Sequence, residues 1–285
     1  MRLKGGCVSY IGNTRKVNQD RIFCGGIQKE NLCFAVGAIC DGIGGSDHGE
    51  IAAGLVLTGI RNWFLRIASL NDLFESDPAV IFAHLLDGAE AWNQDVVRYR
   101  KTTGIATGTT MSILMLFGDH YYTVHVGDSR ILFFRNGNVL TRLTTDDTVL
   151  RNLNGREKYF LTNYMGKSDE LVYSTVSGTY SLGDAFFYCS DGFYHRFTEQ
   201  DAASLYAKLI HEDNPSEKSF WERAEVSKFH MNPKKDNESQ WNTEAAVNCM
   251  PRNESSLLRA LTEIAMEMAD RGDHDNISVG MLATV

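Results

Sequence analysis

The sequence predicts a layered α+β domain, and three observations lead to this prediction. The segment 31–40 (NLCFAVGAIC) is a short apolar run that ends in a turn signal, as a buried strand does. Two longer segments, 46–70 and about 79–99, carry apolar residues at helical spacing. From about residue 110, short runs rich in β-branched and aromatic residues alternate with Gly-Asp and Asn-Gly turns. Helices followed by many short strands are typical of a layered α+β fold.

The two early helices have recognisable starts. Asp47 is a residue type that caps helix N-termini, and Glu50 stands three residues later, as in a capping box. The second helix is expected just after Pro78, because proline is tolerated in the first turn of a helix. The apolar positions that define the two helices are Leu55, Ile60, Phe64 and Ile67 in the first, and Ile81, Leu85, Ala89, Trp92 and Val96 in the second.

The second half of the chain predicts a meander of antiparallel strands over about 110–142, in which RNGN (135–138) is a hairpin signal. Later elements are expected as follows: strands in LVYSTVSG, DAFFYCS and NISVGMLATV, and helices near 199–211 and 254–270. The stretch from about 212 to 250 is polar and irregular. We interpret it as an insertion in a single domain that spans residues 1–285.

Composition narrows the class of protein. The chain has 285 residues, of which 43% are hydrophobic, and a net charge of -8 without a basic block, so nucleic acid is not an expected partner. Its six cysteines form no CxxC pair and suggest neither a zinc site nor a disulfide framework. The N-terminus lacks the apolar region of a signal peptide, and no apolar run approaches about 18 residues. We therefore expect a cytoplasmic protein that does not bind membranes.

Aspartates at the ends of the strand-like runs are the candidate chemical groups. They are Asp41 in AICDGIGG, Asp128 in VHVGDSR, Asp191 in FFYCSDGF and Asp275 in GDHDNISV, with Asp20 in TRKVNQDRI as a fifth. Any one of them alone is more typical of a turn or a cap. Together they suggest a site, because strand ends gather at one edge of a sheet.

Carboxylates that converge repel each other, by roughly 4 kcal/mol for two charges about 4 Å apart at an effective dielectric constant near 20. Such a group needs protons or cations. Ligation by oxygen alone suits magnesium or manganese. Two such ions would lower the pKa of a water molecule between them and would clamp a phosphoryl group.

The order of the motifs then resembles a known family. RKVNQD, DGIGG, GTT (108–110), VGDSR, LTTDDT, LTNYMG, SDG and DN follow one another from Arg15 to Asn276. This order resembles the metal-dependent protein phosphatases of the type 2C class (the PPM family), and in particular its bacterial members. The resemblance implies a four-layer α-β-β-α sandwich, in which two packed antiparallel β-sheets are flanked by helices. It also implies hydrolysis of phosphoserine and phosphothreonine in proteins by a water that bridges two divalent ions, Mn²⁺ or Mg²⁺.

The resemblance assigns metal ligands position by position. Asp41 matches the acid that bridges both metal ions, and the backbone carbonyl of Gly42 matches another ligand. Asp191 and Asp275 match the remaining ligands of the first ion. Asp128 matches a ligand of a third, weaker ion.

The resemblance also assigns residues to the reaction and to the support of the site. Asp20 matches the acid that contacts metal-bound water and orients or deprotonates it. Arg15 matches the guanidinium that binds the substrate phosphate, a task that suits its planar fork of donors. Thr109 and Thr110 are expected to pack or hydrogen-bond beneath the site.

Three positions depart from the family pattern. Ile43 follows the DG motif where several members carry a histidine as candidate general acid, although bacterial members commonly have an apolar residue there. His195 stands where the family often has an acid that serves the third ion, which makes a third ion doubtful because a neutral imidazole weakens a magnesium or manganese site. Gln19 replaces a glutamate and leaves a neutral hydrogen-bonding group.

The segment between LTTDDT and LTNYMG corresponds to the flap of the family. It is short and carries Arg151, Arg156 and Lys158. Two interpretations stay open at this stage, a solvated loop or a contact surface for phosphopeptides.

Two alternatives to an active phosphatase also stay open. A regulatory pseudo-phosphatase would bind a phosphoprotein without cleaving it, and a structural α+β domain would use the aspartates only in turns. The resemblance favours phosphoprotein substrates, with a cognate serine/threonine kinase as a candidate partner. The sequence names neither the substrate nor the general acid.

Overall fold

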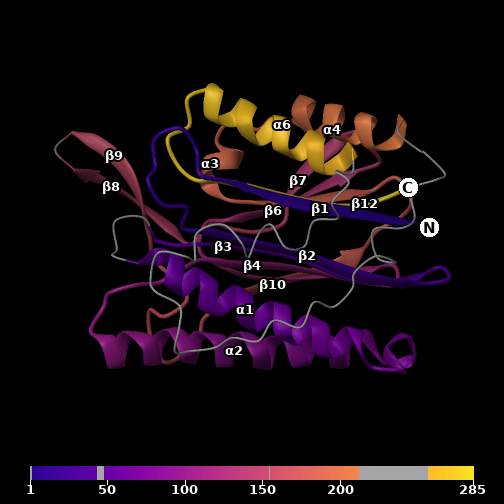
Figure 1. The fold of residues 1–285 in the computed structure, drawn as a ribbon, viewed down its shortest axis with the longest axis horizontal. Coiled ribbons are helices and arrows are strands. Elements are labelled where there is room, and N and C mark those ends of the chain that lie inside the picture. Colours follow the sequence, from indigo (N-terminus) through magenta and orange to yellow (C-terminus); the bar gives the residue numbers. More distant parts are fainter. Residues whose placement is uncertain (1, 44–47, 154, 212–255) are drawn as a thin grey trace.

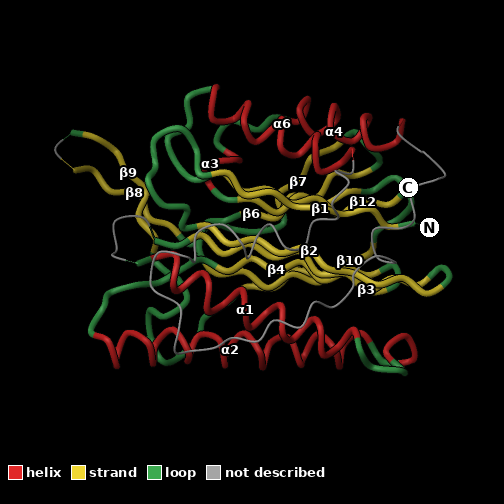
Figure 2. The backbone as a smooth tube through the Cα atoms, in the orientation of Figure 1, coloured by secondary structure: helices red, strands yellow, loops and turns green. Residues whose placement is uncertain are grey.

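The fold is a sandwich of four layers, as Figure 1 shows. The structure is a computed structural model that describes residues 2–43, 48–153, 155–211 and 256–285. One sheet has the order β10-β5-β4-β3-β2 and the other β1-β12-β11-β6-β7. Helices α1 and α2 cover the first sheet, and α4 and α6 cover the second (Figure 2). The predicted fold class is therefore confirmed.

The bounds of the elements follow in chain order. The strands of the first sheet are β2 (Asp20–Lys29), β3 (Leu32–Asp41), β4 (Met111–Phe117), β5 (His120–Val126) and β10 (Ser174–Thr179). Those of the second sheet are β1 (Leu3–Tyr10), β6 (Arg130–Arg135), β7 (Val139–Arg142), β11 (Ala185–Cys189) and β12 (Ile277–Thr284). The helices are α1 (Gly49–Ala68), η1 (Leu73–Glu75), α2 (Pro78–Thr103), α3 (Asp191–Tyr194), α4 (Glu199–His211) and α6 (Ser256–Asp270). A separate hairpin consists of β8 (Thr148–Leu153) and β9 (Arg156–Leu161).

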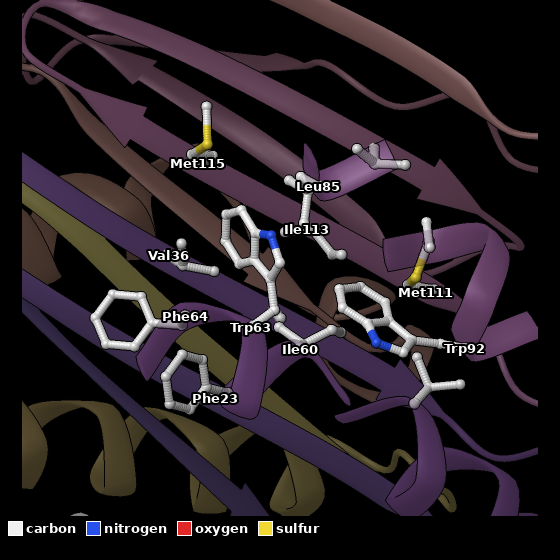
Figure 3. Packing of buried hydrophobic residues seen from close by; sticks show 14 of the residues in the cluster. Phe23, Val36, Ile60, Trp63, Phe64, Leu85, Trp92, Met111, Ile113 and Met115 are labelled. Atoms are coloured by element: carbon white, nitrogen blue, oxygen red, sulfur yellow. The ribbon is translucent and has the colours of Figure 1, made fainter. Parts of the chain in front are cut away.

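Strand β3 shows why the sequence reads as a continuous apolar run. Its even-numbered residues from Phe34 to Cys40 pack in the core beneath α1 and α2, together with Trp63 and Phe64 of α1 (Figure 3). Its odd-numbered residues Cys33, Ala35 and Ile39 pack in the core between the two sheets. Because successive side chains of a strand point to opposite faces, a strand buried on both faces must be apolar at nearly every position.

Tyr188 of β11 fixes the spacing between the two sheets. Its side chain is fully buried, and its hydroxyl donates to the backbone oxygen of Phe23 at 3.0 Å. Glycines make room for the ring on both sides: a Cβ atom on Gly37 of β3 would lie 2.3 Å from it, and one on Gly280 of β12 would lie 2.0 Å from it. No side chain fits at these two positions without displacing the tyrosine.

The substitution Gly280→Ala is therefore expected to lower the free energy of unfolding by about 1–3 kcal/mol, the usual cost of overpacking a core. Gly54→Ala in α1 is the matched control, because a Cβ atom there meets nothing within 4 Å. The control is expected to stabilise the protein by roughly 0.5–1 kcal/mol through helix propensity. Urea unfolding of both variants measures the difference, and equal stabilities would contradict the account of Tyr188.

Helix α1 begins differently from the prediction. Its N-cap is His48, which has a left-handed backbone (φ 70°) and makes no side-chain cap hydrogen bond. Asp47, the predicted cap, lies outside the described residues. Glu50 does not close a capping box onto the helix start, because Gln19 Nε2 donates to its carboxylate at 3.4 Å. By length and composition α1 could cross a membrane, but it packs on β2, β3 and α2 like a helix of a folded core.

Two further differences concern the strands. The predicted meander over 110–142 is not one sheet: β4 and β5 pair in the first sheet, whereas β6 and β7 pair in the second. The chain crosses between the sheets at Gly127, whose positive φ (107°) and adjacent Asp128 look like an ordinary turn in the sequence. The predicted flap is a two-stranded hairpin rather than a loop. The predicted polar insertion, about 212–250, lies outside the described residues, and the single-domain assignment stays a prediction.

Candidate active site

The five predicted acidic residues lie at one end of the sandwich, the end from which α3 and the β8–β9 hairpin project in Figure 1. Asp20 begins β2 and Asp41 ends β3, and the two are direct partners across this strand pair. Asp128 lies in the crossing from β5 to β6. Asp191 begins α3 directly after β11, and Asp275 precedes β12. Sequence segments more than 250 residues apart thus contribute to one edge.

The backbone of Asp41 is held from both sides. Its N–H donates to Thr110 Oγ1 at 2.9 Å, and its carbonyl accepts from Thr109 Oγ1 at 2.8 Å and from the Thr110 N–H at 2.8 Å. The N–H of Gly42 donates to the carbonyl of Gln19 at 3.2 Å. The expectation that Thr109 and Thr110 hydrogen-bond beneath the site is confirmed.

Asn276 holds the loop that carries Arg15 and Asp20, a role that the sequence reasoning missed. Its side-chain nitrogen donates to the carbonyls of Ile11 at 2.9 Å and Val17 at 3.1 Å, and its oxygen accepts from the Gln19 N–H at 2.9 Å. Asn276 is 3% exposed, so a lost partner could not be replaced by water. The only sequence signal was the DN motif, which says nothing about a contact with residues 11–19.

Arg15 lies among the carboxylates. Its Nη2 atom donates to Asp275 Oδ2 at 2.5 Å. Burial lowers the pKa of this guanidinium, but the hydrogen bond and charge of Asp275, with the charges of Asp191 and Asp41, raise it by more. Arg15 therefore stays positively charged and is the cation that faces the acidic edge.

The carboxylates raise one another's pKa values. Burial is the largest cause for Asp41, followed by the charges of Asp20, Asp191, Asp128 and Asp275, and together they raise its pKa well above the usual range. Burial and then Asp275 raise the pKa of Asp191 as well. Such mutual effects require the five side chains to be near neighbours. The structure thus brings the predicted acids together, while their roles as ligands stay predictions.

Asp20 is the most isolated of the acids. It is 2% exposed, and neither carboxylate oxygen has a hydrogen-bond partner among the described residues. Burial raises its pKa to about 6, and Asp191 and Asp275 add to the rise. The hydroxyls of Ser278 and Ser190 oppose the rise in pKa, although they donate to Ser9 and to the Asn276 carbonyl respectively. An unpartnered buried carboxylate is costly and indicates a missing positive charge or proton.

Asp128 lies farther along the same edge. Burial raises its pKa to about 7, and the charges of Asp191 and Asp146 contribute. His195 is exposed, and its Nδ1 atom lies 3.7 Å from Asp273 Oδ2, so its nearest acidic partner is a residue that the prediction had not considered. The third metal site stays a prediction.

The residues present suit a hard cation. No three His, Cys, Asp or Glu side chains among the described residues form a tight, preformed ligand set. Mutual repulsion accounts for this spacing, because carboxylates of like charge separate unless a cation lies between them. The unpartnered oxygens of Asp20 and the raised pKa of Asp41 show that this edge needs positive charge. All of the candidate donors are oxygen atoms, which magnesium and manganese prefer.

Clustered carboxylates and a charged arginine on a double-sheet sandwich define a candidate phosphate hydrolase of the metal-dependent class. The family model described as Protein phosphatase 2C matches residues 13–225. The chain therefore belongs to this family, as its motifs predicted.

Known proteins of the same fold are bacterial phosphatases. The chain is 30% identical to the serine/threonine protein phosphatase PstP of Mycobacterium tuberculosis over 145 residues, which are 50% of this chain and 24% of PstP. The catalytic domain of PstP in complex with two manganese ions superposes with a TM-score of 0.63, at 20% identity over 99% of this chain and 97% of that one. The S. agalactiae serine/threonine phosphatase gives 0.67, at 19% identity over 100% of both chains. These structures confirm the fold.

Proposed function

We propose that this protein is a metal-dependent serine/threonine protein phosphatase. The observation that carries the proposal is the convergence of five carboxylates, one of them buried and unpartnered, beside a charged arginine in a chain of the 2C family. Asp41, Asp191, Asp275 and the carbonyl of Gly42 would hold two Mn²⁺ or Mg²⁺ ions, with Asp128 available to a third. When bound, such ions activate water as a nucleophile at neutral pH and stabilise the charge of the phosphoryl group.

The protein's own groups then divide the remaining work. Arg15, released from Asp275 by a cation there, would donate two hydrogen bonds to phosphate oxygens and orient the ester. Asp20 Oδ would accept the proton of the attacking water, since a pKa of about 6 lies close to neutral pH. Ile43 carries no proton to give to the leaving group, so solvent protonates it.

We propose that the β8–β9 hairpin contacts the substrate protein. Arg151 and Lys158 are partners across the hairpin, and both lie over the ring of Phe160, at 5.8 and 5.7 Å from its centre. Leu150 and Tyr159 are partners on the other face and are 44% and 67% exposed. A basic surface on a protein of net charge -8 suits the acidic surroundings of a phosphorylated side chain.

We further propose a cytoplasmic location and substrates that a serine/threonine kinase has phosphorylated. The five cysteines in the described residues are free thiols, which supports a reducing compartment. The substrate of this reaction, a protein phosphoester, must come from a phosphoryl-transfer reaction onto a hydroxyl side chain.

Metal removal tests the proposed function. Chelation followed by desalting is expected to abolish hydrolysis of 4-nitrophenyl phosphate and of a phosphothreonine peptide, and Mn²⁺ is expected to restore both. Isothermal titration of the chelated protein with Mn²⁺ is the parallel measurement. Binding without turnover would favour a pseudo-phosphatase, and no binding would favour a structural domain.

A further inference from the structure

His125 of β5 is a buried histidine outside the acidic edge. It is 1% exposed, and both ring nitrogens are engaged. Nδ1 lies 2.8 Å from Ser112 Oγ of the adjacent strand β4, and Nε2 lies 3.1 Å from the carbonyl oxygen of Thr145. Thr145 stands three residues before β8, at the root of the hairpin. His125 thus joins the central sheet to the start of the hairpin.

The tautomer of His125 follows from its partners. A carbonyl oxygen only accepts, so Nε2 carries the proton that is donated to Thr145. Burial lowers the pKa of His125, although the charges of Asp147 and Asp146 oppose this. The neutral ring therefore accepts at Nδ1 from the Ser112 hydroxyl, and its two hydrogen bonds have distinct directions.

A continuous set of buried hydrogen bonds leads from Ser112 to the acidic edge. Ser112 Oγ lies 3.1 Å from the carbonyl of Ser129, as a second acceptor for its proton. The Ser129 hydroxyl lies 2.7 Å from Thr110 Oγ1, which accepts from the N–H of Asp41. The group that anchors the hairpin root is therefore also tied to the strands that position Asp41.

The hairpin has little else to set its orientation, because it projects from the body of the sandwich (Figure 1). A second attachment lies at Asp147, whose carboxylate accepts from Gly127 N–H and from Asn163 Nδ2, each at 3.0 Å. Asp147 fixes the two hairpin ends to each other and to the crossing loop. His125 is the link from the root to the paired strands β4 and β5.

We propose that His125 is a positioning residue that fixes the β8–β9 hairpin relative to the acidic edge, so that Arg151 and Lys158 meet a protein substrate whose phosphate lies at Arg15. This inference rests on the proposed function for its effect on turnover, but the attachment itself can be measured without it. A small ester reaches the acidic edge without touching the hairpin, whereas a peptide touches both.

Two near-isosteric variants separate the two hydrogen bonds. Asparagine places its amide near the position of Nδ1, so His125→Asn keeps the contact with Ser112 and loses the one with Thr145. Glutamine reaches the position of Nε2, so His125→Gln keeps the contact with Thr145. Thermal unfolding of both variants establishes that they fold.

Amide exchange over residues 143–149, measured on the full chain, is expected to be about tenfold faster in His125→Asn and within about twofold of wild type in His125→Gln. With Mn²⁺, kcat/KM for a phosphothreonine peptide is expected to fall about tenfold in His125→Asn only, with turnover of 4-nitrophenyl phosphate unchanged. A tenfold loss matches the removal of one hydrogen bond.

Three results would overturn the proposal: exchange in His125→Asn like that of wild type, the same behaviour in both variants, or equal losses on peptide and ester. If wild type hydrolyses neither substrate, the proposed function fails, and the exchange rates alone then decide whether His125 fastens the hairpin.

Discussion

Replacement of Asp41 by asparagine is expected to lower Mn²⁺-dependent kcat by at least about 10³-fold, the upper range for loss of one group that stabilises developing charge. Asparagine has the size of aspartate without its charge, and the hydrogen bonds that hold residue 41 use only its backbone. The metal-free variant is expected to be more stable than wild type at pH 8, because burial and four neighbouring acids raise the pKa of Asp41. Lost turnover together with increased metal-free stability is the signature of a charge kept for a cation.

The matched control for this prediction is Asp87→Asn on the exposed face of α2. Both the melting temperature and the rate of ester hydrolysis of the control should equal those of wild type. Turnover retained by Asp41→Asn would contradict the assignment of Asp41 as a ligand. Turnover lost together with metal-free stability would instead indicate a structural role.

Much of the acidic edge could be predicted because each acid is tied to a local signal. Asp41 and Asp191 follow strands that are apolar at almost every position, so the end of the run locates the carboxylate. Asn276 could not be assigned its role in the same way, because its partners Ile11 and Val17 are joined to it only by the fold. Long-range backbone contacts of this kind leave no trace in spacing or periodicity.

The strands that sequence reasoning missed share a physical cause. β1 and β2 contain paired glycines, Gly5–Gly6 and Gly25–Gly26, which lower strand propensity and interrupt alternation. β8 is exposed along most of its length, so no buried face imposes a period of two on it. The crossing at Gly127 was misassigned because a turn between paired strands and a passage between sheets use the same residues.

The metal-free protein is expected to lose stability as the pH rises from 5 to 8. Asp20 and Asp128 have folded-state pKa values of about 6 and about 7, against an ordinary value of 3.8. The folded chain therefore binds protons that the unfolded chain releases near pH 4, so the free energy of unfolding falls with rising pH through this window. For Asp20 alone, a rise in pKa from 3.8 to about 6 corresponds to roughly 3 kcal/mol.

Thermal unfolding of the chelated protein at pH 5 and pH 8 measures this loss, which for Asp20 amounts to roughly 6–12 °C in Tm at about 2–4 °C per kcal/mol. Asp20→Asn is expected to remove that part of the difference by stabilising the protein at pH 8 alone. Saturating Mn²⁺ is expected to reverse the trend, because protons compete with the ion for the carboxylates and binding strengthens as they ionise. Equal pH dependence in wild type and Asp20→Asn would show that this buried carboxyl group does not carry the destabilising charge, and an unchanged trend with Mn²⁺ would show that the ion does not neutralise the acidic edge.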